Sequence, residues 1–145
     1  MLIFFLIVLD QLTKYFAITA KPDFDVIGNF LRLQYIENTG TIFGLFEDAN
    51  VIFLVIAIIL CFLIGWYMKE NVEKKTLKEK AFMLILAGGI GNIIDRIWRG
   101  FVIDFISLKW VGIFNFSDAF VVIGVVFLIF LEIKEMRLEK EVARK

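Results

Sequence analysis

Four long apolar stretches constrain the fold of this 145-residue chain more than any other feature of its sequence. A helix that crosses a membrane needs about 20 mostly apolar residues. The run 51–68 contains 18 residues without a charge, and the run 111–131 is interrupted by a single acidic residue. Two shorter runs reach spanning length only by including charged residues. The sequence therefore predicts an all-α membrane protein with four transmembrane helices, at 1–20, 51–68, 81–96 and 114–133.

Composition supports a membrane protein and excludes several kinds of chemistry. Hydrophobic residues make up 60% of the chain, against about 45–50% in soluble domains. The chain has no histidine and a single cysteine, which excludes a disulfide framework, a Cys/His zinc site and a nucleophile served by a histidine base. Its 16 basic residues balance 16 acidic ones, whereas a nucleic-acid-binding protein carries a basic excess. We expect no metal, no cofactor and no nucleic-acid partner.

The loops predict the orientation, because lysine and arginine in short loops accumulate on the cytoplasmic side of a membrane. Five of these residues lie between the second and third apolar stretches and five follow the fourth, whereas the other two connections together hold five. We therefore expect a single domain, 1–145, with both termini in the cytoplasm. Segments 21–50 and 97–113 are expected on the opposite, extracytoplasmic side.

The extracytoplasmic segment 28–46 carries the pattern of a small sheet. Residues 30–36 alternate partly between apolar and polar, which favours a short strand. Asn-Thr-Gly at 38–40 is a turn signal, and 41–46 can form a returning strand. The sequence thus predicts a small β-sheet that lies on the membrane surface.

Two charged residues, Asp10 and Lys14, interrupt the first apolar stretch. A charge in the middle of a membrane costs about 2.5–3.5 kcal/mol on insertion scales. Because the two residues are four apart, they share a helix face and can pair. We favour a structural ion pair over a direct chemical role for these residues. The interruption, and the absence of a basic residue before the apolar run, also disfavour a cleaved signal peptide.

Three polar residues, Asn92, Asp95 and Arg96, end the third stretch after glycines at 88, 89 and 91. Their spacing places them on one helix face, and the glycines permit close approach of a neighbouring helix. The glycines do not form a phosphate loop, because no strand precedes them and the Lys-Ser/Thr ending is missing. Both Asp95 and Arg96 can cap this helix and anchor it at the interface, and we favour this structural interpretation for Asp95.

Two acids flanked by apolar residues fall near the same membrane surface. Asp104 lies in Val-Ile-Asp-Phe-Ile, and Asp118 opens the fourth helix with Asn115 three residues before it. By itself, Asp118 is explained as a carboxylate at a helix N-terminus. Two carboxylates held close together share a proton, so that one can activate a water and the other can protonate the leaving group of a peptide bond. The two acids therefore form a candidate catalytic pair.

The residues leave other readings open. The only serines are Ser107 and Ser117, and either could use Lys109 as a base, although no spacing supports this. A small ion- or proton-coupled transporter would carry protons on buried acids, but it needs them along a path through the bilayer. A noncatalytic membrane assembly factor would leave both candidate acids without a role.

Five motifs follow one another along nearly the whole chain. They are Asp-Gln-Leu-Thr-Lys at 10–14, Glu-Asn-Thr-Gly at 37–40 followed by Phe43-Gly44, Gly-Asn-Ile-Ile-Asp-Arg at 91–96, Val-Ile-Asp-Phe-Ile at 102–106 and Phe-Asn-Phe-Ser-Asp at 114–118. Each string alone is weak evidence, but all five in this order within a four-helix protein are highly specific. Together they resemble the lipoprotein signal peptidase family, also called signal peptidase II.

The resemblance implies an aspartic endopeptidase of the bacterial cytoplasmic membrane, with its active site near the extracytoplasmic face. It implies removal of the signal peptide from prolipoproteins by cleavage before a diacylglyceryl-modified cysteine. By motif position, Asp104 and Asp118 match the catalytic pair of the family. The residues that match its substrate-binding or site-supporting positions are Asp10, Lys14, Asn38, Gly40, Asn92, Asp95, Arg96 and Asn115.

The resemblance also implies partners and a role for the outer segments. The expected partners are diacylglyceryl-modified prolipoproteins, membrane lipid and the cyclic peptide inhibitor globomycin, and the protein is expected to act as a monomer. The outer sheet and adjoining surface segment of the family match 28–46 and 97–110, and we interpret 28–46 as a cover over the acids. Ser117 stands where alanine is frequent in the family.

Overall fold

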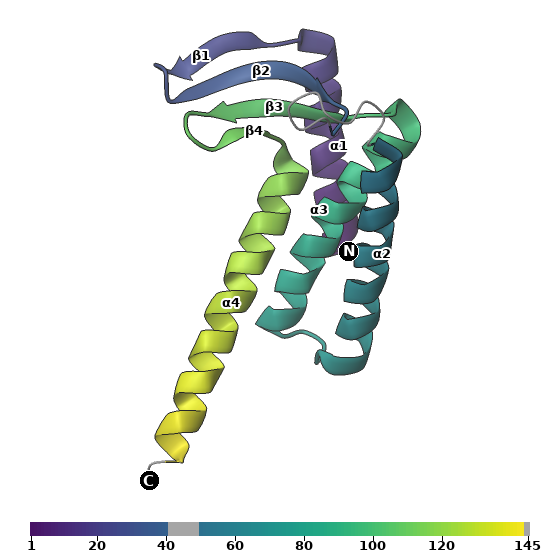
Figure 1. Ribbon diagram of the computed structural model, residues 1–145. Coiled ribbons are helices and arrows are strands. Elements are labelled where there is room, and N and C mark those ends of the chain that lie inside the picture. The colour runs from purple at the N-terminus through teal and green to yellow at the C-terminus, as the bar shows by residue number, and fades with distance from the viewer. Residues whose placement is uncertain (41–49, 144–145) are drawn as a thin grey trace.

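The computed structural model describes residues 1–40 and 50–143. This part of the chain contains four long helices and four strands (Figure 1), which are α1 (Leu2–Ala20), β1 (Asp23–Ile27), β2 (Leu31–Asn38), α2 (Asn50–Asn71), α3 (Leu77–Arg99), β3 (Val102–Leu108), β4 (Gly112–Phe114) and α4 (Phe116–Val142). Each helix is long and apolar enough to cross a membrane. The prediction of four membrane helices with a small sheet is therefore confirmed.

Three helices extend beyond the ranges predicted from the apolar runs, because hydropathy marks the apolar part of a helix rather than its ends. α3 begins four residues before the expected start, after the N-cap Thr76, whose side chain accepts the N–H of Glu79 at 3.1 Å. It ends at Gly100, whose φ of 81° takes the chain out of the helix. α4 begins two residues later than predicted because Asn115 caps it. The charged turns at the far ends of α2 and α4 are also helical.

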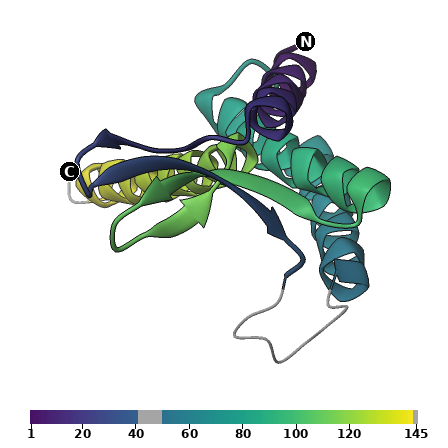
Figure 2. The same cartoon turned by 90° about the horizontal axis from the view of Figure 1, so that it is seen from above.

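The four strands form one antiparallel sheet in the order β1-β2-β3-β4 across one end of the helices (Figures 1 and 2). β2 lies close to the predicted strand, but its partners are β1 and β3, and its Ile36 stands opposite Asp104. β3 joins the sheet from a segment more than 60 residues away, which a local turn signal cannot reveal. Its first four residues are all buried, so the alternation typical of a strand is absent. The predicted returning strand, 41–46, lies outside the described residues.

α3 occupies the middle of the helices and contacts α1, α2 and α4. α1 runs from the N-terminus toward the sheet, while the α2–α3 connection and the C-terminus lie at the end opposite the sheet (Figure 1). α2 is the most apolar span, yet none of its described residues is buried by the rest of the protein. In water such a surface would aggregate, so lipid is the solvent that this helix requires.

Glycines bring α3 and α4 into close contact. A Cβ added at Gly88 would lie 2.2 Å from the carbonyl oxygen of Ser117 and 2.7 Å from Val121 Cγ2. On the facing helix, a Cβ at Gly124 would lie 2.8 Å from the carbonyl oxygen of Ala81. Because backbone oxygens cannot move aside as a flexible side chain can, these glycines set the distance between the helices. This packing holds the start of α4 against α3.

We expect Gly88→Ala to lower the stability of the protein by about 1–3 kcal/mol, the usual cost of overpacking. The matched control is Gly65→Ala in α2, where the added Cβ meets nothing within 4 Å. That control removes a mid-helix glycine and is expected to be neutral or slightly stabilising. Thermal unfolding midpoints in detergent measure both, and equal midpoints for the two variants would contradict the packing account.

Candidate active site

Asp104 and Asp118 meet where the sheet joins the start of α4, and we call them the dyad. Asn115 contacts both. Its Nδ2 donates to Asp104 Oδ1 at 2.7 Å, and its backbone N–H donates to Asp118 Oδ2 at 3.1 Å. Asn115 is fully buried and Asp104 nearly so, whereas Asp118 is half-buried. The structure thus brings together the two acids that the sequence singled out.

A capping box places Asp118. Asn115 is the N-cap of α4, and its Oδ1 accepts the backbone N–H of Asp118 at 3.0 Å. In turn, the Asp118 carboxylate accepts the backbone N–H of Asn115, which completes the reciprocal pair of hydrogen bonds of a capping box. Its second oxygen, Oδ1, accepts Nδ2 of Asn92 from α3 at 2.7 Å. The local sequence and one neighbouring helix therefore fix the carboxylate of Asp118.

The end of β2 supplies a donor to Asp104. Asn38 Nδ2 donates to Asp104 Oδ2 at 2.8 Å, so both oxygens of this acid accept an amide N–H. The Asn38 Oδ1 in turn accepts the backbone N–H of Gly40 at 2.9 Å. Gly40 has a φ of 84°, and an added Cβ would lie 2.6 Å from the ring of Phe53. Gly40 therefore orients the Asn38 amide, and a larger residue would be strained there.

Burial raises the pKa of Asp104 above its usual value, and the nearby charge of Asp118 adds to this effect. The amide donors of Asn38 and Asn115 act in the opposite direction, because they stabilise the ionised form. Burial prevails, so Asp104 keeps its proton to a higher pH than a free aspartate does. An acid of this kind is suited to deliver a proton.

A buried ion cluster lies beside the dyad. The ammonium of Lys14 contacts Asp10 Oδ2 at 2.9 Å and Asp95 Oδ2 at 2.9 Å, and all three side chains are fully buried. The ammonium also donates to Asn92 Oδ1 at 3.0 Å. The predicted pairing of Asp10 with Lys14 is confirmed, and the cluster adds a second carboxylate to it.

The interpretation of Asp95 as an interfacial anchor is wrong. Asp95 is fully buried and is held by Lys14 and by Arg99, whose Nη1 lies 2.5 Å from Asp95 Oδ1. The physical reason is that α3 packs on α1, so its polar face turns toward another helix rather than toward water. Arg96 is half-buried, its Nη1 lies 3.4 Å from the Asn92 carbonyl oxygen, and its guanidinium lies over the ring of Phe53.

Sequence reasoning missed two members of this cluster. Gln11 Nε2 donates to Asp95 Oδ1 at 3.1 Å, and Arg99 Nη1 donates to Gln11 Oε1 at 3.2 Å. In the distribution of loop charges, Arg99 is simply one of the five basic residues of the outer connections. Its spacing of four from Asp95 is the signal that could have identified it.

The two serines lack the surroundings of a nucleophile. Ser117 Oγ is buried, and it has no hydrogen-bond partner within residues 1–40 and 50–143. Ser107 lies in β3 opposite Ile113 and Arg32. Lys109 holds its ammonium 5.0 Å from the ring centre of Trp110 rather than against a serine. The geometry therefore favours the dyad over a Ser–Lys pair.

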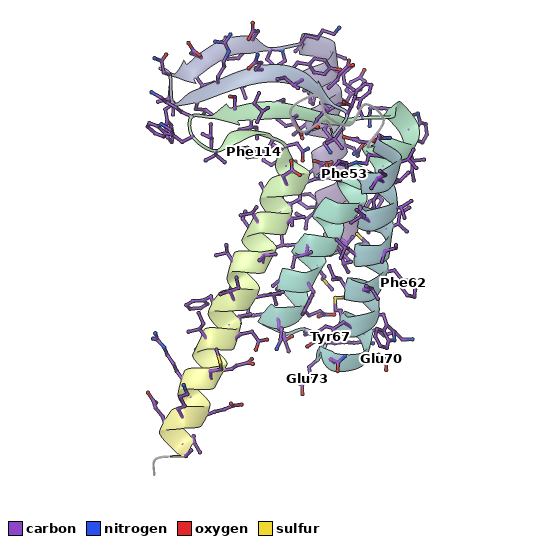
Figure 3. The ribbon with its side chains drawn as sticks, in the orientation of Figure 1. Phe53, Phe62, Tyr67, Glu70, Glu73 and Phe114 are labelled. Atoms are coloured by element: carbon purple, nitrogen blue, oxygen red, sulfur yellow. The ribbon has the colours of Figure 1, made fainter. Side chains whose placement is uncertain are left out.

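An apolar pocket of about 290 Å³ opens beside Asp118. Its other lining residues come from the β3–β4 turn, β4 and the first turns of α4, and they are Val111, Ile113, Phe114, Ala119, Val122 and Ile123. Figure 3 shows Phe114 at the sheet end of the molecule, beside the start of α4. Of the two acids, Asp118 thus borders an apolar pocket on the side where α4 faces outward.

Comparison with known proteins agrees with this arrangement. The family model described as Signal peptidase (SPase) II matches residues 2–134. The lipoprotein signal peptidase of Streptococcus pneumoniae is 34% identical over 139 residues, covering 92% of this chain and 91% of its own. That of Thermodesulfovibrio yellowstonii is 40% identical over 142 residues, covering 92% of each.

Solved structures agree as well. A bacterial membrane enzyme solved by the in meso method has a TM-score of 0.82 with this chain at 31% identity, over 92% of this chain and 90% of its own. Sequence and fold therefore agree over nearly the full length. The chain belongs to the signal peptidase II family, and it is a multi-pass bacterial membrane peptidase by that membership.

Proposed function

We propose that this protein removes the signal peptide from bacterial prolipoproteins, using Asp104 and Asp118 to cleave the bond before a diacylglyceryl-modified cysteine. Membership of a family whose relatives are named lipoprotein signal peptidases supports the substrate. The observation that carries the aspartic mechanism is the contact of one buried asparagine, Asn115, with both acids.

The surroundings of the two acids assign them different roles. Both acids accept two N–H groups, but only Asp118 lies in the first turn of a helix, a position that suits a carboxylate. Asp104 is the acid whose pKa is raised by burial, so it starts the reaction with the proton. We therefore assign the role of acid to Asp104, and the role of base falls to Asp118.

The reaction then balances in one cycle. Asp118 takes a proton from a water whose oxygen attacks the carbonyl carbon of the scissile bond. As the C–N bond breaks, Asp104 gives its proton to the leaving nitrogen. The products are a carboxyl group on the signal peptide and a free amino group on the modified cysteine. Transfer of the proton from Asp118 to Asp104 restores the starting state.

The apolar pocket beside Asp118 fits the lipid part of this substrate. Its lining is apolar apart from the acid itself, and each buried methylene of an acyl chain contributes about 0.8 kcal/mol to binding. The pocket borders α4 on a face where Val122 is 61% and Ile123 is 54% exposed. A substrate lipid could therefore enter from the bilayer without passing through water.

The distribution of basic residues supports an orientation with both termini in the cytoplasm. Among the described residues, the α2–α3 connection and the adjoining helix ends carry five lysines, and the C-terminal turns of α4 carry three further basic residues. Both regions lie at the end opposite the sheet (Figure 1). In this orientation the sheet lies at the extracytoplasmic membrane surface, and the dyad beside it is near that face.

A cleavage assay tests the function. The purified protein is incubated with a diacylglyceryl-modified prolipoprotein, and the loss of the signal peptide is followed as a gel shift. We expect cleavage of the modified substrate, inhibition by globomycin and no effect of a chelator. The unmodified precursor serves as the control. An uncleaved substrate together with proton flux into liposomes would favour the transporter instead.

The pH profile tests the role of Asp104. Asn38→Ala removes a donor that stabilises the ionised form of Asp104, so it raises the pKa of this acid further. Because Asp104 must carry the proton, the alkaline limb of the kcat/KM profile is expected to move to higher pH. Asn71→Ala is the control, since the Asn71 side chain donates to the Tyr67 carbonyl oxygen at the end of α2 far from the sheet. A move of the acid limb to higher pH, with the alkaline limb unchanged, would instead assign the proton to Asp118.

A further inference from the structure

The residue directly before each acid of the dyad is held by a buried carboxylate from the helices. Asp10 Oδ1 accepts the backbone N–H of Ser117 at 2.9 Å, at the start of α4. Asp95 Oδ2 accepts the backbone N–H of Ile103 at 3.2 Å, in β3. Both carboxylates are fully buried. The chain is therefore clamped one residue away from both catalytic side chains.

Lys14 joins these two clamps. Its ammonium contacts Asp10 Oδ2 and Asp95 Oδ2, each at 2.9 Å, and donates to Asn92 Oδ1 at 3.0 Å. An ammonium group has three N–H donors, so all of them are used. The third contact also leads to the dyad, because Asn92 Nδ2 donates to Asp118 Oδ1 at 2.7 Å. Asn92 thus links Lys14 to Asp118 directly, whereas Asp10 and Asp95 link it to the residue before each acid of the dyad.

Neutralisation alone does not explain this arrangement. The buried cluster contains two carboxylates, Asp10 and Asp95, and two cations, Lys14 and Arg99, so its charges balance. Two separate pairs would balance as well, without one ammonium bridging both acids. Replacement of a buried ion pair by apolar residues is often neutral or stabilising. We therefore explain the bridge by the geometry that it imposes on Asp10 and Asp95, rather than by a gain in stability.

The bridge joins elements that are far apart along the chain. Lys14 lies on α1, whereas the two acids of the dyad lie on β3 and α4. Gly91 of α3 leaves the room for this approach, because an added Cβ would lie 2.1 Å from Ser117 Oγ and 2.8 Å from Asp10 Oδ2. The start of α4, the beginning of β3 and the middle of α1 are thus tied to one point.

We propose that Lys14 is a positioning residue of the peptidase, which sets the separation of the Asp104 and Asp118 carboxyl groups by bridging Asp10 and Asp95. This inference rests on the proposed function. The separation determines how strongly the two acids share a proton, and hence how far apart the two limbs of the pH profile lie. Lys14 touches neither acid and acts through the residues that hold them.

The test is a charge-balanced double variant, Asp10→Asn with Lys14→Met. It removes one negative and one positive charge, so the remaining pair of Asp95 and Arg99 stays balanced. The amide introduced at position 10 keeps an oxygen that can accept the Ser117 N–H, while the bridge and the contact of Lys14 with Asn92 are lost. We expect kcat to fall about 100-fold, the scale of a small misplacement of catalytic groups, with KM changed less than about twofold. The limbs of the pH profile should move closer together.

Two controls accompany this variant. Lys78→Met with Glu132→Gln removes an ion pair between α3 and α4 at the opposite end of the protein and should leave kcat unchanged. Asp104→Asn measures the residual rate of cleavage when one acid of the dyad is missing. If Asp104→Asn itself cleaves normally, the proposed function fails, and this outcome is distinguishable from a failure of the bridge alone.

Several results of this experiment would overturn the positioning role of Lys14. A folded double variant with the kcat and the pH profile of the unaltered protein would show that Lys14 only neutralises charge. A lower kcat with an unchanged profile would mean a smaller active fraction, and would also overturn positioning. If the variant does not fold, Asp95→Asn with Arg99→Gln breaks the other half of the bridge and should give the same loss. If neither double variant folds, the cluster is required for folding, and the proposal is refuted.

Discussion

Asp104→Asn and Asp118→Asn are each expected to lower the rate of prolipoprotein cleavage by about 10³-fold or more, while the protein still folds. The substitution keeps the size of the side chain and part of its hydrogen bonding, but an amide can neither take a proton from water nor deliver one. General acid and general base catalysis each contribute about 10²–10⁴-fold. Rates on a diacylglyceryl-modified substrate measure the loss.

The matched control for both variants is Asp25→Asn. Asp25 lies on β1, is exposed, and pairs at 3.4 Å with Arg32 on the neighbouring strand. Exposed pairs contribute little to stability, so this variant should fold and cleave like the unaltered protein. Near-normal cleavage by either dyad variant would falsify the aspartic mechanism.

Asn115→Ala is expected to lower both stability and cleavage, whereas Asn115→Ser should lower mainly cleavage. Serine caps a helix about as well as asparagine, and loss of the cap in the alanine variant costs about 1 kcal/mol. Neither replacement carries the Nδ2 donor that contacts Asp104 at 2.7 Å. Removal of one oriented donor from an active site typically lowers kcat by about 10²–10³-fold. Unfolding midpoints and kcat, measured side by side, separate the two effects.

Thr76→Ala provides the opposite control. Thr76 caps α3 at the end far from the sheet, through a bond to the Glu79 N–H. Its loss should lower stability by a similar amount and leave kcat unchanged. Full activity of Asn115→Ser would mean that the amide bridge to Asp104 is not needed for cleavage, and the two acids would then require another explanation of their arrangement.

The buried polar residues and the exposed apolar ones have a common explanation. A soluble protein of this size would bury Phe62 and Trp66, yet these residues of α2 are 71% and 60% exposed. Meanwhile Asp10, Lys14 and Asp95 are fully buried. In a bilayer the apolar side chains face lipid, and the interior between the helices is where charged groups find partners. A hydrolytic site can therefore be held beside the bilayer.

Local sequence patterns predicted much of the fold. Apolar runs predicted the four helices because the thickness of a bilayer sets a minimum length for each. A spacing of four predicted the pair of Asp10 and Lys14, since residues so spaced lie on one helix face. The position of Asn115 three residues before Asp118 likewise indicated the helix start. Each of these patterns involves residues within one turn or one continuous run.

Contacts between segments that are far apart in the sequence could not be predicted from local patterns. The pairing of β2 with β3 places Asn38 beside Asp104, 66 residues away. Periodicity could not reveal it because β3 is buried on both faces. The interpretation of Asp95 failed for a related reason, since a polar helix face can turn toward water or toward another charged helix. Which of these occurs depends on packing between helices.

By itself, the sequence determined the number of membrane helices, the acids available for chemistry and, through its ordered motifs, the family. Those properties follow from composition, spacing and local hydrogen bonding. Only the tertiary structure decided that Lys14 bridges Asp10 and Asp95, and that those carboxylates hold the chain before each acid of the dyad. The physical reason is that a buried charge must find partners wherever packing brings them, and packing joins segments that are far apart in the sequence.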